Sequence, residues 1–217
     1  MRIGILGTGT LAAALGEAWA HAGHDLVIGG RSRDRAERLA RRLGDGALAA
    51  PPREAATERD AVLLAVSWDG ADEMLALAGA SDGVLEGTPL IDPTNAVSHG
   101  EGVLLTDPGE SMARRIARSA PGAHVVKAFH LFPADQWTSR PTDGRPTDVR
   151  PPVTVAMCGD HPAALHVTGD LVRAAGAEPA VLGGLDRVHQ LEQVAGFVIG
   201  LAFTGADPNS AIPRVAS

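Results

Sequence analysis

The chain has 217 residues, of which 45% are hydrophobic and 21% are charged, and its formal net charge is -7. This length suits one domain with a substantial core and at most a small appendage. The negative charge and the lack of a basic stripe with aromatic residues argue against a nucleic-acid partner. We find neither a signal peptide nor an apolar run of about 18 residues, so no membrane partner is expected.

Residue types that are rare or absent exclude several kinds of site and reaction mechanism. Cys158 is the single cysteine, which excludes an internal disulfide and favours the reducing cytoplasm as the location. Lys127 is the only lysine and tyrosine is absent, so a Tyr-x-x-x-Lys proton relay of the short-chain dehydrogenase kind is impossible. The sequence has no cluster of histidine, cysteine and carboxylate residues with the spacing of a metal site, so no metal is implied. A small-molecule substrate is therefore the expected partner.

The chain alternates apolar strands with helices. We expect strands at residues 2–6, 25–28, 47–50, 61–66, 89–92, 124–129, 153–157 and 179–182. We expect helices at residues 10–22, 33–43, 71–80, 111–119, 162–175 and 185–203. Apolar runs without alternation are typical of strands buried on both faces. The fold class is therefore α/β, a Rossmann-type doubly wound, mostly parallel sheet with a short C-terminal helical region.

The expected domain organisation follows from this pattern. Residues 1–184 form the dinucleotide-binding Rossmann domain, and residues 185–217 form a short helical region that completes the substrate site. Residues 135–152 interrupt the alternation with prolines and polar residues, which indicates a loop, either a mobile lid or a surface insertion. Gly196 and Gly200 in the last helix would let another helix or a flat ligand approach closely.

A glycine-rich turn joins the first strand to the first helix. Gly7 permits a tight turn, Gly9 lets the backbone approach a pyrophosphate, and Ala12 lets the helix pack closely on the strand. The helix N-terminus offers free amides and the positive end of its dipole to phosphates. The residues expected to bind the dinucleotide here are Gly7, Thr8, Gly9, Thr10 and Leu11.

The end of the second strand distinguishes the two nicotinamide dinucleotides. NAD-binding folds place a carboxylate about 20 residues beyond the glycine turn, where it binds the ribose 2′-hydroxyl. This chain instead has Arg31 and Ser32, which can bind a 2′-phosphate that a carboxylate would repel. We therefore expect NADP(H) as the cofactor, with Arg35 or Arg33 as a further phosphate contact.

The other strand ends supply candidates for the nicotinamide half, because ligands in this architecture bind beyond the carboxyl ends of parallel strands. Trp68, next to Ser67, could flank the nicotinamide or its ribose. Asn95 could bond a ribose hydroxyl or the carboxamide, with Ala128 beside it. A structural role is the alternative for each.

Two side chains at these ends are candidate proton donors. They are His130 and Lys127, which we treat as the candidate catalytic residues. Asp92 also lies there, but it is expected to cap the turn around Asn95.

Five segments in this order resemble the NADPH-dependent deazaflavin (coenzyme F-420) reductase family: residues 7–12, 29–33, 66–68, 92–95 and 127–129. The N-terminal module is also similar to that of pyrroline-5-carboxylate reductases and metalloreductases. The resemblance implies a homodimer that moves hydride between NADP(H) and a deazaflavin co-substrate, with little acid–base help. By position, Thr8, Arg31 and Ser32 would hold phosphates, with Trp68 and Asn95 near the nicotinamide.

The chain departs from this family where the second substrate should bind. His130 stands where relatives usually place asparagine, and the loop at residues 135–152 is longer. Two alternatives therefore stay open. One is an NADPH-dependent reductase of a small imine or carbonyl metabolite, with His130 or Lys127 as proton donor. The other is a non-enzymatic NADP-sensing module.

Overall fold

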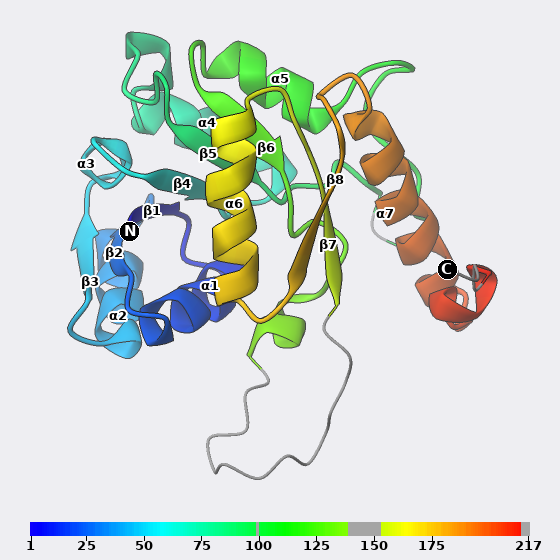
Figure 1. Ribbon diagram of the computed structural model, residues 1–217, viewed down its shortest axis with the longest axis horizontal. Helices are drawn as coiled ribbons and strands as arrows, with labels where there is room; N and C mark the ends of the chain where they lie inside the picture. Colours follow the sequence, from blue (N-terminus) through cyan, green and yellow to red (C-terminus); the bar gives the residue numbers. More distant parts are fainter. Residues whose placement is uncertain (99, 139–152, 214–217) are drawn as a thin grey trace, which may run out of the picture.

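The computed structural model describes residues 1–98, 100–138 and 153–213. These residues form an eight-stranded sheet covered by helices, and the expected Rossmann-type fold is confirmed (Figure 1). The strands are β1 (Arg2–Leu6), β2 (Asp25–Gly29), β3 (Ala47–Ala50), β4 (Ala61–Leu64), β5 (Pro89–Asp92), β6 (His124–Lys127), β7 (Thr154–Gly159) and β8 (Glu178–Gly183). Their order in the sheet is β3-β2-β1-β4-β5-β6-β7-β8, and only the β6–β7 pair of this sheet is antiparallel.

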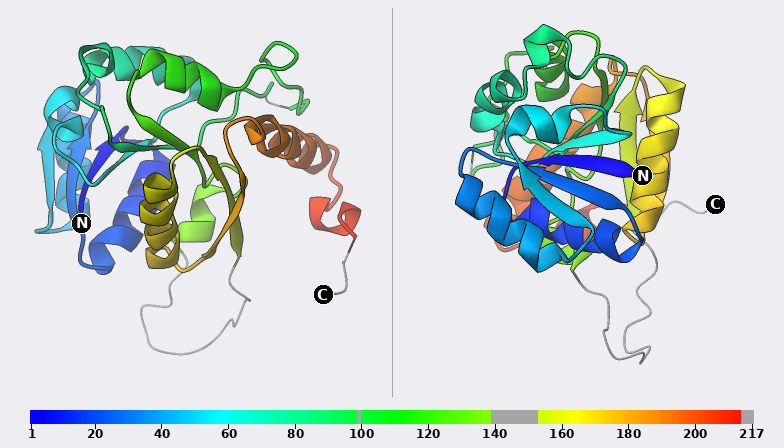
Figure 2. Two further views of the ribbon diagram at one scale, coloured as in Figure 1. Left: turned by 45° about the horizontal axis from the view of Figure 1, so that its top comes forward. Right: turned by 90° about the vertical axis from the view of Figure 1, so that its left-hand side faces the viewer.

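Helices cover both faces of the sheet, as Figure 2 shows from two sides. They are α1 (Thr10–His21), α2 (Arg33–Leu43), α3 (Pro52–Ala56), α4 (Ala71–Leu77), α5 (Met112–Ser119), α6 (Pro162–Ala174) and α7 (Val188–Phe203). Side chains of α1, α2 and α6 pack on one face, and those of α3, α4, α5 and α7 pack on the other. In β4, Leu63 faces the first layer while Val62 and Leu64 face the second, all fully buried. This two-sided burial explains the uninterrupted apolar runs.

Two expected strands end earlier than predicted, and both end at the site. β4 stops at Leu64 because the following backbone packs against the glycine turn, where an ideal Cβ on Gly7 would lie 2.0 Å from the Ala65 carbonyl oxygen. β6 stops at Lys127 because Phe129 has a φ of 61°, which turns the chain out of the sheet. Non-glycine residues with positive φ are uncommon and cluster at functional sites.

The helix α3 was not predicted. It is held against β1 because Gly4 has no side chain: an ideal Cβ there would lie 2.3 Å from the Ala55 carbonyl oxygen. The last helix begins at Val188 rather than at residue 185, since residues 184–187 form a turn that leads out of β8. The proposed domain boundary after residue 184 falls in this turn.

The remaining expectations concern the loop and the C-terminal region. Of the loop at residues 135–152, the first part belongs to the 3₁₀ turn Ala134–Trp137, and Trp137 is buried. The expected lid itself, at residues 139–152, lies outside the described residues. Among the described residues, the backbone of Gly102 packs on Gly196 and Gly200. Within the part of the chain that the structure describes, no helix has both the length and the apolar character needed to cross a membrane.

Candidate functional site

The glycine turn after β1 has the geometry that a bound pyrophosphate requires. Gly7 has a φ of 135°, a conformation that side-chain-bearing residues rarely adopt. An ideal Cβ on Gly9 would meet no atom of the described residues within 4 Å, so the backbone there is open to a ligand. No side chain caps α1 and no acidic residue lies in its first turn, which leaves its amides available to phosphate. The turn therefore fits the diphosphate of a dinucleotide.

A cavity of about 240 Å³ lies over the carboxyl ends of β1, β2 and β4. Seven predicted cofactor residues line it, namely Gly7, Thr8, Gly9, Arg31, Ser32, Arg35 and Ser67. Thr10 and Leu11, the first residues of α1, do not line it, and neither do Trp68, Asn95 and Ala128. The structure thus brings together the residues proposed for the adenosine and phosphate half.

One end of this cavity carries the groups proposed for the 2′-phosphate. Ser32 is the N-cap of α2, where its Oγ accepts a hydrogen bond from the Arg35 amide at 3.4 Å and keeps its own proton to donate. The Arg31 guanidinium is exposed and forms an ion pair with Glu73 of α4, with 2.8 Å between Nη1 and Oε2. Sequence reasoning missed Glu73, because nothing local to α4 indicates which loop faces it.

A second cavity opens beside Trp68. It measures about 230 Å³ and extends from Trp68 and Ala96 to Arg115 and Arg118 of α5. Trp68 is half-buried at the start of the 3₁₀ turn Trp68–Gly70. Ser67 lines the first cavity and Trp68 lines the second, so these consecutive residues stand between the two.

Asn95 connects the ends of β5 and β6. Its Nδ2 donates a hydrogen bond of 2.6 Å to the carbonyl oxygen of His130. Its Oδ1 is buried and has no hydrogen-bond partner within the described residues. A buried amide oxygen without a partner is costly.

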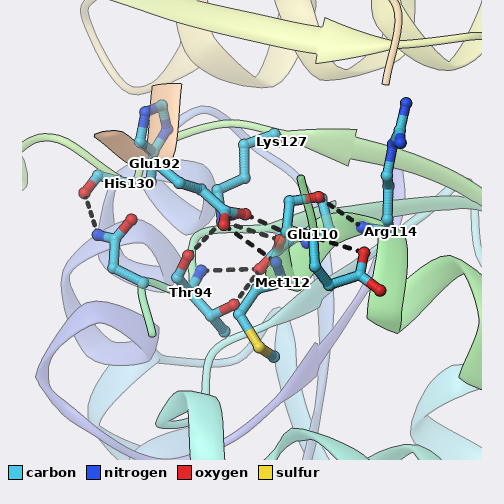
Figure 3. Close-up of polar contacts among 11 residues, drawn as sticks. Thr94, Glu110, Met112, Arg114, Lys127, His130 and Glu192 are labelled. Carbon is cyan, nitrogen blue, oxygen red and sulfur yellow. Dashed lines mark hydrogen bonds and ion pairs between the residues drawn. The ribbon is translucent and has the colours of Figure 1, made fainter. Parts of the chain in front are cut away.

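Lys127 lies at the centre of a buried charge network (Figure 3). Its Nζ is 3.0 Å from Asp92 Oδ2 and 3.1 Å from Glu192 Oε1, and it donates to the Thr94 carbonyl oxygen. The Glu192 carboxylate also accepts hydrogen bonds from the first two amides of α5. Asp92 Oδ1 accepts hydrogen bonds of 2.8 and 2.6 Å from the amide and hydroxyl of Thr94, so its expected capping role is confirmed.

His130 is also buried, with 6% of its surface exposed. Its carbonyl oxygen accepts the hydrogen bond from Asn95. Figure 3 shows its ring beside α7. Burial, reinforced by the positive charge of Lys127, lowers the pKa of His130 to about 3, and the nearby Leu191 backbone opposes this shift without cancelling it. The imidazole is therefore neutral at physiological pH. Neither His130 nor Lys127 lines either of the two cavities described above.

An aromatic cluster fixes the turn at Phe129, between Lys127 and His130. The Phe129 ring makes edge contacts with Trp19 of α1 and Trp137, with centroids 6.1 and 5.3 Å apart. This packing holds Phe129 at its positive φ and so sets the direction in which His130 leaves β6.

A protein-family model matches residues 2–96 of the chain, and that family is described as "NADP oxidoreductase coenzyme F420-dependent". The matched segment contains the glycine turn, Arg31, Ser32 and Asn95. The resemblance inferred from these motifs is therefore confirmed over this part of the chain.

The chain is also similar in sequence to a known reductase. The chain is 27% identical over 193 residues to a metalloreductase of Rattus norvegicus, a match that covers 89% of this chain and 36% of the relative. The chain thus spans about a third of the length of that curated relative. The description of the family and the name of this relative both refer to oxidoreductases.

Three solved structures show the fold. A hypothetical protein of Sinorhizobium meliloti has a TM-score of 0.71 at 25% identity, covering 85% of each chain. A "putative f420 dependent nadp-reductase" of an Arthrobacter species has a TM-score of 0.76 at 22% identity, covering 96% of each chain. A Streptomyces aurantiacus imine reductase has a TM-score of 0.61 at 18% identity, covering 94% of this chain and 61% of the reductase.

Proposed function

We propose that this chain, whose residues 2–96 match the coenzyme F-420-dependent NADP oxidoreductases, transfers hydride between NADP(H) and a deazaflavin of the F-420 type. The observation that carries the proposal is the cavity in which an uncapped helix N-terminus meets Arg31, Ser32 and Arg35. One end fits a diphosphate and the other fits a 2′-phosphate. When bound, NADPH supplies the hydride, and the protein supplies binding and orientation.

Different residues would bind different parts of the cofactor. The amides of α1 and of the turn at Gly7 to Gly9 would hold the diphosphate, and Arg31 and Ser32 would hold the 2′-phosphate. Asn95 would lie near the nicotinamide half, as the family resemblance implies. Trp68 would flank the nicotinamide half of the cofactor beside the second cavity, in which we place the hydride acceptor.

The buried candidate acids favour a deazaflavin over an imine or carbonyl. Reduction of a small C=N or C=O group needs a positioned proton donor within hydrogen-bond reach. Lys127 is held by two carboxylates beneath the surface, and His130 is neutral. The second candidate, an imine or carbonyl reductase that uses His130 or Lys127, is supported by the structural likeness to the imine reductase.

Mixing the protein with NADPH and oxidised deazaflavin tests the proposal. We expect loss of absorbance at the deazaflavin band at a rate proportional to protein concentration. Turnover of small cyclic imines or carbonyls without deazaflavin reduction would establish the second candidate. NADPH binding without any oxidation above background would instead favour the NADP-sensing module.

Arg31→Gln is expected to raise the KM for NADPH by about 10–100-fold, because it removes charge-assisted hydrogen bonds to the 2′-phosphate. The KM for NADH should change little, since NADH has a hydroxyl at this position. Steady-state kinetics with both cofactors measure the effect. Arg33→Gln is the matched control, because Arg33 pairs with Glu37 and does not line the cavity. An equal change for both cofactors would contradict the assignment.

We also propose a cytoplasmic homodimer, as the family resemblance implies. Val194 and Phe197 support the dimer, since they expose 39% and 48% of their surface on α7. The buried, unpaired Cys158 is compatible with a reducing compartment. Light scattering coupled to size-exclusion chromatography tests the dimer, and a monomeric mass at micromolar concentration would contradict it.

A further inference from the structure

A carboxylate pairs with an arginine that lines the dinucleotide cavity where a 2′-phosphate is proposed to bind. Arg31 follows β2 and lines the cavity, whereas Glu73 lies on α4, next to the lining residue Met74. Their side chains meet with 2.8 Å between Nη1 and Oε2, and they are 64% and 56% exposed. The guanidinium proposed to bind the phosphate therefore already has an anionic partner.

We propose that Glu73 is a specificity-determining residue, which lowers the preference for NADP over NAD by competing with the 2′-phosphate for Arg31. The proposal rests on the NADP site described above and adds a residue to it. A ligand with a 2′-phosphate must take Arg31 from Glu73 or share it. A ligand with a 2′-hydroxyl leaves the pair intact.

The charges around this end of the cavity make the competition selective. Arg31 and Arg35 line the cavity, and Glu73 lies against Arg31. Asp69 adds a second carboxylate on the same side: the Ser67 side chain holds the pKa of Asp69 below its usual range, and Arg31 contributes to this shift. Arg31 thus interacts with two carboxylates, Glu73 and Asp69. A phosphate dianion is repelled by Glu73 at close range, whereas a neutral hydroxyl is not.

The size of the effect follows from the exposure of the pair. Exposed ion pairs are weak, and water and salt screen the repulsion between Glu73 and a phosphate. We therefore expect Glu73→Gln to tighten binding of a 2′-phosphate by about three- to tenfold. If Glu73 instead oriented Arg31 for the phosphate, the same substitution would weaken binding, so the sign of the change decides between the two roles.

Calorimetric titration with adenosine 2′,5′-bisphosphate and adenosine 5′-monophosphate tests the proposal, because the two probes differ only in the 2′-phosphate. Glu73→Gln should lower the Kd for the bisphosphate by about three- to tenfold and leave that for the monophosphate unchanged. Glu37→Gln is the matched control: it removes a carboxylate from a neighbouring arginine pair on α2 that does not line the cavity. It should change neither constant. An unchanged or higher Kd for the bisphosphate in Glu73→Gln overturns the role of Glu73.

Arg31→Gln separates this failure from a failure of the NADP site itself. If Arg31→Gln weakens the bisphosphate and Glu73→Gln has no effect, the NADP site stands and the role of Glu73 is wrong. If the wild-type protein binds both probes equally and Arg31→Gln changes neither, both the NADP site and the role of Glu73 are wrong.

Discussion

Lys127→Met is expected to lower the free energy of unfolding by about 3–5 kcal/mol, because it removes the cation between two buried carboxylates. The side chains of Lys127 and Asp92 are fully buried and that of Glu192 is 1% exposed, at 3.0 and 3.1 Å from Nζ. Methionine preserves most of the volume but no charge. Asp92 and Glu192 would then face each other without a cation, and one of them must take up a proton or be hydrated.

Urea unfolding followed by circular dichroism measures this loss. Arg53→Met is the matched control, because Arg53 pairs with Asp82 at 2.6 Å while both side chains are more than half exposed. That exposed pair should contribute no more than about 1 kcal/mol. A Lys127→Met variant no less stable than Arg53→Met would contradict a structural role for the network. Neutralising Asp92 and Glu192 as well, with Asp92→Asn and Glu192→Gln, should recover part of the loss.

The part of the site that sequence reasoning reached is encoded locally. Gly7, Gly9 and the following helix are consecutive, so a strand, a turn and a helix N-terminus can be predicted from one stretch of residues. Arg31 and Ser32 follow the next strand, and parallel strands bring their carboxyl ends to one edge. These residues meet in one cavity because β2 and β4 lie on either side of β1 in the sheet.

The contacts that sequence reasoning missed join distant segments. Glu73 pairs with Arg31 and Glu192 pairs with Lys127, in each case from a helix whose placement depends on the whole fold. One signal for Glu192 was available. It stands four residues after Val188 and three before Ala195, on the apolar face of the last helix, where a carboxylate needs a buried partner. The only lysine of the chain was the natural candidate.

The stability of the protein is expected to fall as the pH decreases from about 6.5 to 3, with a contribution from His130. The folded state lowers the pKa of His130 from 6.5 to about 3, so in this window the unfolded chain binds a proton that the folded chain cannot. Above pH 6.5 His130 is neutral in both states and leaves the free energy of unfolding unchanged. Between pH 6.5 and 3 it lowers this free energy by about 1.4 kcal/mol per pH unit of acidification. Burial is the main cause and Lys127 adds to it, so the contribution depends on the network described above.

The slope of the free energy of unfolding against pH, compared between the wild-type protein and His130→Asn, isolates this contribution from that of the carboxylates. The variant should show a shallower fall between pH 6.5 and 4. His124→Asn is the control: burial also lowers the pKa of His124, but its side chain is only half-buried, so its effect should be smaller. Parallel curves for the wild type and His130→Asn would show that His130 titrates normally.

The lowered pKa of His130 has a kinetic consequence, because a histidine that is neutral above pH 3 leaves no inflection near 6.5 in the pH profile of kcat. An inflection there that disappears in His130→Asn would restore His130 as a proton donor and favour imine or carbonyl reduction over transfer to a deazaflavin.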